Sequence, residues 1–523
     1  VIFKSQHADI DIPESDLTSV VLSRVDELGD KAALIDGPTG RSLSYLQLRE
    51  QVNRMAVGLN RRGFRKGDVF AIFIPNVPEY AVVFLGVAAI GGVNTTVNSL
   101  YSCADLIHQF NDSGARFLLT IPDFLDRALP AAEACGIEEI FVLGEAEGIT
   151  PFSELLDNDG HAPVVEIDPK ADLVALPYSS GTTGLSKGVM LTHENLISNM
   201  VLSCQSNPID ESDSAIGVLP FFHIYGMVLI LNLSVYRGAT LVTIPRFELE
   251  QFLQLVQDYK ITNLNLVPPL VLALAKHPSV DNYDLSSVRI IGCGAAPLGE
   301  ELEQACATRL NCLIYQGYGL TEVNGVITIN SAHFFLAKPE SVGPPLPIME
   351  ARIVGDDGTD QPTGDPGRLG VRGGNVFRGY LNQPEANAEI LVDGWFDTGD
   401  IGYLDEDGFL FLVDRAKDMV LRGGENIYSA EVEAAIYEHP AIAEAAVFAV
   451  PDERLGERVG VAIVLLSGES MTADELRAHT AVLIASFKVP EDVWFLDDPL
   501  PRNANGKFVK RELRDMLVGT TVD

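Results

Sequence analysis

Short apolar runs that alternate with longer amphipathic segments fill residues 31–336 of the 523-residue chain. Residues 78–89, for example, place apolar side chains at helical spacing directly after such a run. Apolar runs of this length are typical of buried strands, and strands that alternate with helices form parallel sheets covered by helices on both faces. This part is therefore predicted to be α/β, with strand candidates at residues 69–74, 116–120, 139–143, 172–176 and 240–244.

The pattern changes after about residue 337. Residues 341–414 are dense in Gly, Pro and Asp, which predicts antiparallel strands joined by tight turns, as in a small β-barrel. A second mixed pattern begins near residue 430. We expect an α/β protein with a large N-terminal domain, residues 1–414, of two helix-flanked sheets plus a small β-barrel. A small α+β C-terminal domain, residues 415–523, would follow it.

Charge and cysteine content narrow the range of functions and locations. With 73 acidic and 37 basic side chains the net charge is −36, which does not suit nucleic-acid binding, because that needs clustered Lys and Arg. The six cysteines form no C-x-x-C pair, so free thiols and a cytoplasmic location are expected. The longest apolar run, residues 81–93, is shorter than the roughly 20 residues of a membrane span, and no signal segment opens the chain.

The most informative stretch is residues 178–188, YSSGTTGLSKG, between a predicted strand and a helix expected to begin near His193. Its glycines let the backbone bend sharply and bring N–H groups close to an anion, its hydroxyls are neutral donors, and Lys187 adds a positive charge. Such a loop suits the phosphates of a nucleoside triphosphate. It is not a Walker A loop, because Ser186 precedes the lysine and Gly188 follows it. The candidates are Ser179, Ser180, Gly181, Thr182, Thr183, Gly184 and Lys187.

Residues 176–196, LPYSSGTTGLSKGVMLTHENL, resemble the signature of the adenylate-forming acyl-CoA synthetase superfamily, in its branch of 4-coumarate–CoA ligases and bacterial fatty-acyl-CoA ligases. Seven further motifs continue the resemblance in order over nearly the whole chain, and eight ordered motifs are far more specific than any one of them. The seven are LPFFHIYG (219–226), GAAPLG (294–299), YQGYGLTE (315–322), DGWFDTGD (393–400), VDRAKDM (413–419), GGENIYSAEVE (423–433) and PLPRNANGK (499–507).

The resemblance implies an AMP-forming acid–thiol ligase that uses ATP, Mg²⁺ and coenzyme A on a small carboxylic acid. The carboxylate would attack the α-phosphate of ATP to form an acyl-adenylate and pyrophosphate, and the thiol of coenzyme A would then displace AMP. Such a reaction depends on charge neutralisation and positioning more than on a protein nucleophile. The expected partners are these small molecules, with a homodimer as an open alternative to a monomer.

By the same resemblance, several motif residues would bind the nucleotide. Tyr318 would stack on adenine, and Asp400, supported by Arg415, would accept hydrogen bonds from the ribose hydroxyls. Glu322 would hold Mg²⁺ beside the phosphates, since that ion prefers hard oxygen ligands. Judged alone, these residues could also be a core aromatic, a turn aspartate and a helix-capping acid. The other nucleotide candidates are Gly294, Ala295, Ala296, Pro297, Gln316, Gly317, Gly319, Leu320 and Thr321.

Two residues far apart in the sequence would serve the reacting carboxylate. His223, embedded among aromatics, would orient it toward the α-phosphate, although alone it could equally be a core histidine. Lys507 would bridge the carboxylate and the phosphate as negative charge builds up. The resemblance thus assigns catalysis to Lys507, His223, Glu322, Thr182 and Lys187, and the acyl site to His223, Tyr225, Gly317 and Val326.

Lys417 matches the hinge of the family, which implies a mobile C-terminal domain. Rotation about it would withdraw Lys507 and bring in the loop that contains Gly423 and Gly424, so that one site serves two reactions. The nucleotide-binding set therefore also includes Lys417, Gly423, Gly424 and Lys507. Ser429 stands where many relatives carry proline.

Acyl-pocket positions depart from the pattern of plant coumarate ligases. Leu229 replaces a small polar residue, Gly292 replaces a lysine, and residues 323–325, VNG, replace Ala-Gly-Pro. These changes remove polar partners for a phenolic hydroxyl. We therefore expect a hydrophobic acid, with a medium- or long-chain fatty acid ahead of 4-coumarate or another aryl or cinnamic acid.

Three other functions are alternatives to the ligase. An amino-acid-activating domain should carry an acid near His223 to hold the substrate ammonium, and residues 219–230 contain none. A non-catalytic acyl or nucleotide sensor would need neither Glu322 nor Lys507. A luciferase-like monooxygenase shares every motif, so the sequence leaves this alternative open.

Overall fold

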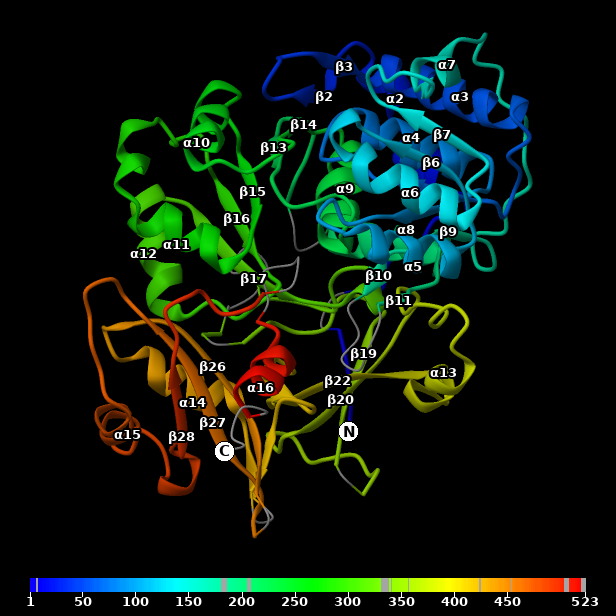
Figure 1. Cartoon of the computed structure of the whole chain (residues 1–523). Helices are drawn as coiled ribbons and strands as arrows, with labels where there is room; N and C mark the ends of the chain where they lie inside the picture. Colours follow the sequence, from blue (N-terminus) through cyan, green and yellow to red (C-terminus); the bar gives the residue numbers. More distant parts are fainter. Residues whose placement is uncertain are drawn as a thin grey trace.

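The chain forms a large N-terminal part and a small C-terminal part, each built of sheets and helices (Figure 1). The predicted fold class is confirmed. The computed structural model describes residues 1–5, 8–179, 186–204, 208–330, 338–339, 341–355, 357–422, 425–452, 454–502 and 508–518.

The first sheet is mostly parallel and is covered on both faces. On its central strand β4 (Val69–Ile72), Phe70 and Ile72 face the core that contains α3 (Tyr45–Arg61) and α4 (Glu79–Ala89). Ala71, and Phe73 directly after the strand, face the opposite core, which contains α5 (Cys103–Ser113) and α6 (Leu125–Cys135). Covering on both faces explains the continuous apolar runs in the sequence. Within the described residues the strand order is β12 (Leu191–Thr192), β9 (Leu173–Ala175), β5 (Val93–Thr96), β4 (Val69–Ile72), β6 (Ala115–Thr120), β7 (Glu139–Val142) and β8 (Thr150–Pro151).

The second sheet shares one core with the first. Ala215, Leu241 and Ile290 face the shared core, and their neighbours along the strands face helices α10 (Leu249–Asp258), α11 (Pro268–Lys276) and α12 (Glu300–Leu310). In the part of the chain that the structure describes, its order is β18 (Thr328–Asn330), β17 (Leu313–Tyr318), β16 (Ile290–Cys293), β15 (Asn263–Leu266), β13 (Ser214–Gly217), β14 (Thr240–Thr243), β2 (Ala32–Asp36) and β3 (Ser42–Ser44).

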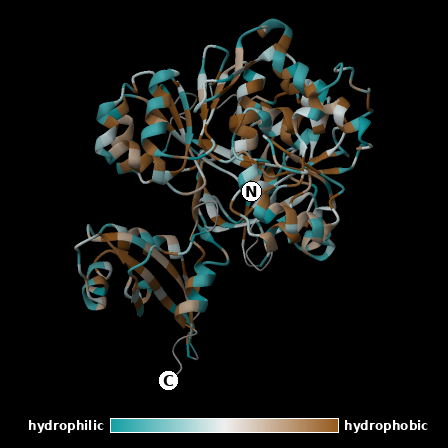
Figure 2. Ribbon diagram, turned by 45° about the horizontal axis from the view of Figure 1, so that its top comes forward, coloured by the Kyte–Doolittle hydropathy of each residue, from teal (hydrophilic) through white to brown (hydrophobic). Residues whose placement is uncertain are grey.

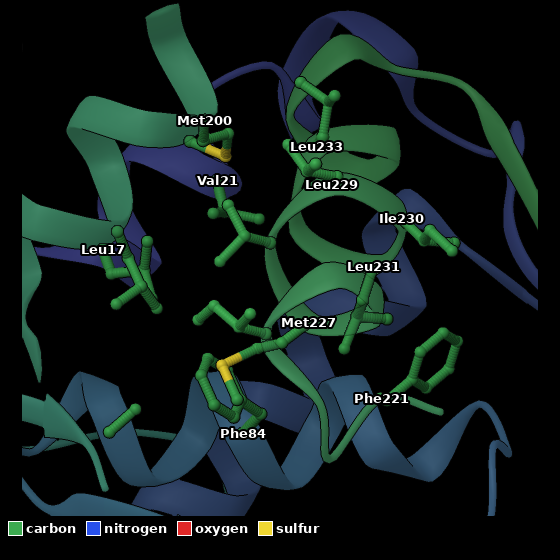
Figure 3. Packing of buried hydrophobic residues seen from close by; sticks show 14 of the residues in the cluster. Leu17, Val21, Phe84, Met200, Phe221, Met227, Leu229, Ile230, Leu231 and Leu233 are labelled. Carbon is green, nitrogen blue, oxygen red and sulfur yellow. The ribbon is translucent and has the colours of Figure 1, made fainter. Parts of the chain in front are cut away.

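Figure 3 shows the shared core at close range. Met227 of the π-helix η2 (Tyr225–Asn232) points toward Phe84 of α4, and Leu17 and Val21 of α1 (Leu17–Val21) belong to the same buried cluster. Figure 2 shows the same preference along the chain, with brown apolar segments turned inward and teal polar ones at the periphery. Burial of apolar side chains between the two sheets is thus the main stabilising contribution to the large part.

The segment predicted as a β-barrel is an antiparallel sheet. Its described strands run in the order β1 (Ile2–Lys4), β19 (Glu350–Val354), β20 (Gly367–Arg372), β22 (Trp395–Leu404) and β21 (Leu391–Val392), with β23 (Leu410–Arg415) also on β22. Register shifts in the β20–β22 and β22–β23 pairs bend it. Among these described strands the ladder is open at β1, which pairs only with β19, so the predicted small barrel takes the form of this bent antiparallel sheet.

The C-terminal part is a five-stranded sheet with helices on both faces. Helices α14 (Ser429–Tyr437) and α15 (Ala473–Thr480) cover one face, and α16 (Lys510–Val518) packs on the other. Its described strand order is β25 (Glu425–Ile427), β24 (Val420–Arg422), β27 (Gly456–Leu465) and β26 (Ile442–Asp452), with β28 (Asp492–Phe495) on β27. The boundary after residue 414 stays a prediction, as does the mobility of this part.

The apolar run at residues 81–93 contributes a buried helix, as expected. Every residue of α4 from Tyr80 to Ala88 is buried. No helix in the described ranges is long and apolar enough to cross a bilayer. The cytoplasmic location stays a prediction.

His193 opens α8 (His193–Ser203) from a fully buried position. Its Nδ1 accepts a hydrogen bond from the backbone N–H of Leu17 at 3.0 Å, and its Nε2 has no partner among the described residues. Burial lowers the pKa of His193 to about 4, since the charged form would lose its hydration. The histidine is therefore neutral in the folded state at neutral pH.

We expect His193 to make the large part acid-sensitive. In the unfolded chain His193 takes up a proton near the ordinary pKa of 6.5, but in the folded chain only near 4. The stability that the neutral histidine contributes is therefore lost as the pH falls between these values. Between pH 7 and pH 5 the free energy of unfolding should fall by about 2 kcal/mol. Urea unfolding at both pH values checks this, and an equally steep dependence in His193→Gln would contradict it.

Candidate functional site

Three segments that are distant in sequence meet beside the phosphate-loop candidate. They are the hairpin of β10 (Tyr178–Ser179) and β11 (Lys187–Gly188), the turn after β17, and residues 377–381. The N–H of Leu381 donates to the carbonyl of Gly188 at 2.8 Å, and the N–H of Phe377 donates to that of Glu322 at 2.8 Å. These backbone bonds fix the segments against one another.

Glu322 is the acid at the centre of this junction. Its side chain is buried, and its Oε1 accepts hydrogen bonds from the hydroxyls of Ser179 at 3.1 Å and Tyr380 at 2.8 Å. Among the described residues, Oε2 has no hydrogen-bond partner. Glu322 is thus held by side chains from two other segments, which a helix-capping role does not require.

This carboxylate fits a magnesium ion. In the described ranges no group of three or more His, Cys, Asp or Glu could hold a metal ion. Proteins commonly bind Mg²⁺ through one or two carboxylates together with the phosphates of a substrate, so a single oriented carboxylate beside a phosphate loop suits it. Glu322 is the described residue that would hold the ion.

Lys187 supplies the positive charge of the junction. Its Nζ lies 5.1 Å from the centre of the Tyr380 ring. Within the described part of the chain, no carboxylate lies within 4.0 Å of this nitrogen, so the charge is available to an anionic ligand.

Tyr318, Asp400 and Arg415 form a second polar cluster. The Tyr318 hydroxyl donates to Asp400, and Nε of Arg415 lies 3.1 Å from Oδ1 of the same carboxylate. Tyr318 and Asp400 are both buried. The structure therefore brings the predicted adenine and ribose residues together. The side-chain amide of Gln316, in contrast, forms hydrogen bonds within the protein. Its oxygen accepts from the N–H of Leu298, and its nitrogen donates to the carbonyl of Leu298 and to Glu303.

The predicted acyl and nucleotide residues meet at the turn after β16. A side chain on Gly294 would come 3.3 Å from the carbonyl oxygen of Gly317 and 3.3 Å from the Tyr225 ring. A Cβ added to Gly317 would likewise lie 3.5 Å from Cγ1 of Val326. The same segment, which includes Ala295, Ala296 and Pro297, leads from the strand to α12.

Tyr225 begins the π-helix η2, and His223 lies two residues before it. The backbone N–H of Tyr225 donates to Nδ1 of His223 at 3.3 Å, and its hydroxyl donates to the carbonyl of Gly292 at 3.3 Å. π-Helical turns are rare and are frequent at functional sites. The structure thus places both predicted substrate residues on one irregular turn.

Part of the prediction falls outside the described residues. Those candidates are Ser180, Gly181, Thr182, Thr183, Gly184, Gly423, Gly424 and Lys507. Lys417 lies between β23 and β24, where burial lowers the pKa of its ammonium group.

A partly buried network beside the predicted hinge was missed in the sequence. Asp414 accepts hydrogen bonds from the N–H and the hydroxyl of Ser429, and Nζ of Lys510 lies 2.6 Å from that hydroxyl and 2.9 Å from Oε1 of Glu433. Proline at position 429 could make neither bond to Asp414. The departure at Ser429 was the one available signal, but nothing in the sequence identifies Asp414 as its partner.

Tyr380 was also missed. It contacts Glu322 through its hydroxyl and Lys187 through its ring. A single tyrosine in the stretch RGYLNQPE forms no recognisable chemical pattern, so no local signal could have found it.

The family follows from comparison with known proteins. The AMP-binding enzyme model matches residues 22–381, and the model of the AMP-binding enzyme C-terminal domain matches residues 431–507. The chain belongs to the AMP-binding enzyme family. The predicted superfamily is confirmed, as is the class of AMP-forming acid–thiol ligases with their use of ATP, Mg²⁺ and coenzyme A.

The similarity covers nearly the full length of the relatives. The 4-coumarate–CoA ligase 1 of Solanum tuberosum is 37% identical over 529 residues, covering 99% of this chain and 97% of that protein. ATP-bound MatB from Rhodopseudomonas palustris has a TM-score of 0.87 at 30% identity, over 96% of this chain and 99% of that one. O-succinylbenzoate–CoA synthetase (MenE) from Bacillus subtilis, in complex with the acyl-adenylate intermediate OSB-AMP, has a TM-score of 0.84 at 31% identity, over 96% and 99%.

Gly319 should tolerate no side chain. A Cβ there would collide with the carbonyl of Gly325 and come 2.6 Å from Val326 Cα, whereas a Cβ on Gly299 meets nothing within 4 Å. We expect Gly319→Ala to lower the free energy of unfolding by about 1–3 kcal/mol. Gly299→Ala, the control, should cost only about 0.5 kcal/mol, for a weaker helix cap. Urea unfolding decides, and equal losses in both variants would contradict the prediction.

Proposed function

We propose that this AMP-forming acid–CoA ligase acts on a hydrophobic carboxylic acid, and on a medium- or long-chain fatty acid ahead of a hydroxycinnamate. One observation carries the proposal: the Tyr225 hydroxyl is already bonded to the carbonyl of Gly292, so it is engaged within the protein. Positions 229 and 292 offer no other polar side chain to the substrate, because they are occupied by a leucine and a glycine.

Gly292 supports this view because the protein itself fills the space beside it. A Cβ at this position would lie 2.7 Å from Cζ of Tyr315 and 2.9 Å from Oδ1 of Asn265, so no lysine side chain could extend from it. Leu229, one helical step beyond Tyr225, is buried in the shared core. Neither position can therefore provide a partner for a phenolic hydroxyl.

The third departure has a different effect from the one expected. Val323 is fully buried, and the Asn324 amide donates to the carbonyl of Asn375 at 2.9 Å. Gly325 has a φ of +132°, and a side chain there would meet Oδ1 of Asn199 at 2.7 Å. Residues 323–325 therefore anchor the loop that carries Glu322, and they give no argument about chain length.

A hydroxycinnamate is the second candidate. The potato 4-coumarate–CoA ligase covers nearly this entire chain at 37% identity, and this supports an aryl substrate on grounds independent of the pocket. Activity across a panel of acids separates the two candidates.

In the first step a carboxylate oxygen attacks the α-phosphorus, the bond to the bridging oxygen of pyrophosphate breaks, and an acyl-adenylate forms. His223 and Lys507 would orient the carboxylate, and Lys187 with the loop donors would hold the phosphates. Mg²⁺ held by Glu322 would offset phosphate charge. Asp400 and Tyr318 would hold the ribose and the adenine.

In the second step the sulfur of coenzyme A attacks the acyl carbonyl, the bond to AMP breaks, and the thiol proton leaves to solvent. Rotation about Lys417 would remove Lys507 and bring residues 423–426 to the thiol path. The change of conformation would let one pocket serve two different nucleophiles.

A panel of acids tests the substrate proposal. We expect pyrophosphate release with octanoate through palmitate to exceed release with 4-coumarate at least 10-fold in kcat/KM, because an unpaired phenolic hydroxyl is costly to bury. AMP and an acyl-CoA should appear only when coenzyme A is present. Faster turnover of 4-coumarate would overturn the fatty-acid preference, and light emission or oxygen uptake would indicate a monooxygenase.

Lys507→Ala tests the catalytic assignment. We expect acyl-adenylate formation to slow by about 100-fold or more, the order that loss of one charge-stabilising group costs. Lys488→Ala is the control on the same domain, since its Nζ pairs with Glu431 at 2.7 Å. Equal pyrophosphate release by parent and Lys507→Ala would contradict the assignment.

A further inference from the structure

Among the described residues, the Tyr380 hydroxyl is one of two side-chain groups that donate a hydrogen bond to Glu322. It lies 2.8 Å from Oε1, and the Ser179 hydroxyl lies 3.1 Å from the same oxygen. Both donors are on one oxygen, which leaves Oε2 without a hydrogen-bond partner among the described residues. Outer hydrogen bonds of this kind fix the orientation of a metal-ligating carboxylate.

The ring of the same tyrosine contacts the cation of the junction. Lys187 Nζ lies 5.1 Å from the ring centre, within the range of a cation–π attraction. Tyr380 thus touches both a positive and a negative group of the candidate site, each through a different part of its side chain.

The backbone of Tyr380 is held rigidly. Its N–H donates to Oδ1 of Asn387 at 2.7 Å, and its carbonyl accepts from Nδ2 of the same asparagine at 2.8 Å. The backbone of Tyr380 also forms an antiparallel bridge with Val189. The ring of Phe377 packs edge-on against the Tyr380 ring, with 5.1 Å between the ring centres. A side chain on so firm a support can fix the positions of its neighbours.

We propose that Tyr380 is a positioning residue with two separable roles: its hydroxyl orients Glu322 for the divalent cation, and its ring holds Lys187 for the phosphates. The proposal rests on the proposed function, because it assumes that Glu322 and Lys187 bind a metal–nucleotide complex.

Metal binding is measured directly, without turnover. The probes are Mn²⁺, followed by electron paramagnetic resonance, and α,β-methylene-ATP, which cannot form an acyl-adenylate. Tyr380→Phe should weaken Mn²⁺ binding to the protein–nucleotide complex about 10-fold. It should leave metal-free nucleotide affinity unchanged, because the ring remains. Tyr380→Leu should in addition weaken metal-free nucleotide binding about 3-fold, through loss of the ring contact.

Two further variants exclude a general effect on folding. Tyr437→Phe is the matched control, because that hydroxyl bonds only to the backbone of Ala445 in the described part of the small domain, and its Mn²⁺ affinity should equal that of the parent. In a Glu322→Gln background, Tyr380→Phe should cause no further loss of Mn²⁺ affinity, because the hydroxyl acts through that carboxylate. A purely structural role would give the same loss in both backgrounds.

The outcomes separate this inference from the proposed function. Parent-like Mn²⁺ affinity in Tyr380→Phe, or an equal loss with and without Glu322, would overturn the positioning role while leaving the ligase assignment intact. A parent protein that binds no Mn²⁺ with the nucleotide would overturn both.

Discussion

Backbone hydrogen bonds between residues 188–190 and residues 378–381 hold the candidate site together. They join the end of the β10–β11 hairpin to the segment that follows β20 of the antiparallel sheet. The N–H of Phe377, in the same segment, donates to the carbonyl of Glu322. Because hydrogen bonds have a narrow range of length, the three segments keep one geometry although they belong to different sheets. The spacing of Lys187, Glu322 and Tyr380 follows from this backbone junction.

Charge imposes a second constraint. A nucleoside triphosphate, coenzyme A and a carboxylic acid are all anions, and the chain carries a net charge of −36. Long-range repulsion must therefore be countered locally, by neutral donors and a few well-placed cations. In the proposed function Lys187, whose ammonium group lies over the Tyr380 ring, would meet this requirement, whereas the charge of Arg415 is already balanced by Asp400. An acidic protein can thus hold a strongly anionic ligand without a broad basic surface.

The sequence predicts individual strands and helices better than it predicts how strands pair in a sheet or which side chains meet. Strands such as β6 and β7 are recovered nearly residue for residue, because a strand covered on both faces must be continuously apolar. The order and closure of the antiparallel strands are harder to predict, because they depend on long-range pairing, which short strands and turns do not encode. The motifs bring Tyr318, Asp400 and Glu322 to the site, but Tyr380 escapes because its contact with Glu322 spans 58 residues and exists only in the folded chain.

The pairing of β1 with β19 has a consequence for biogenesis. Ile2 lies opposite Arg352, so the two strands of this pair are separated by some 350 positions in the sequence. During translation β1 stays unpaired until β19 has left the ribosome, which happens only after most of the polypeptide has been made. Local pairs such as β4 with β5 can form early. The antiparallel sheet is therefore among the last units to be completed, and the junction that depends on it matures late.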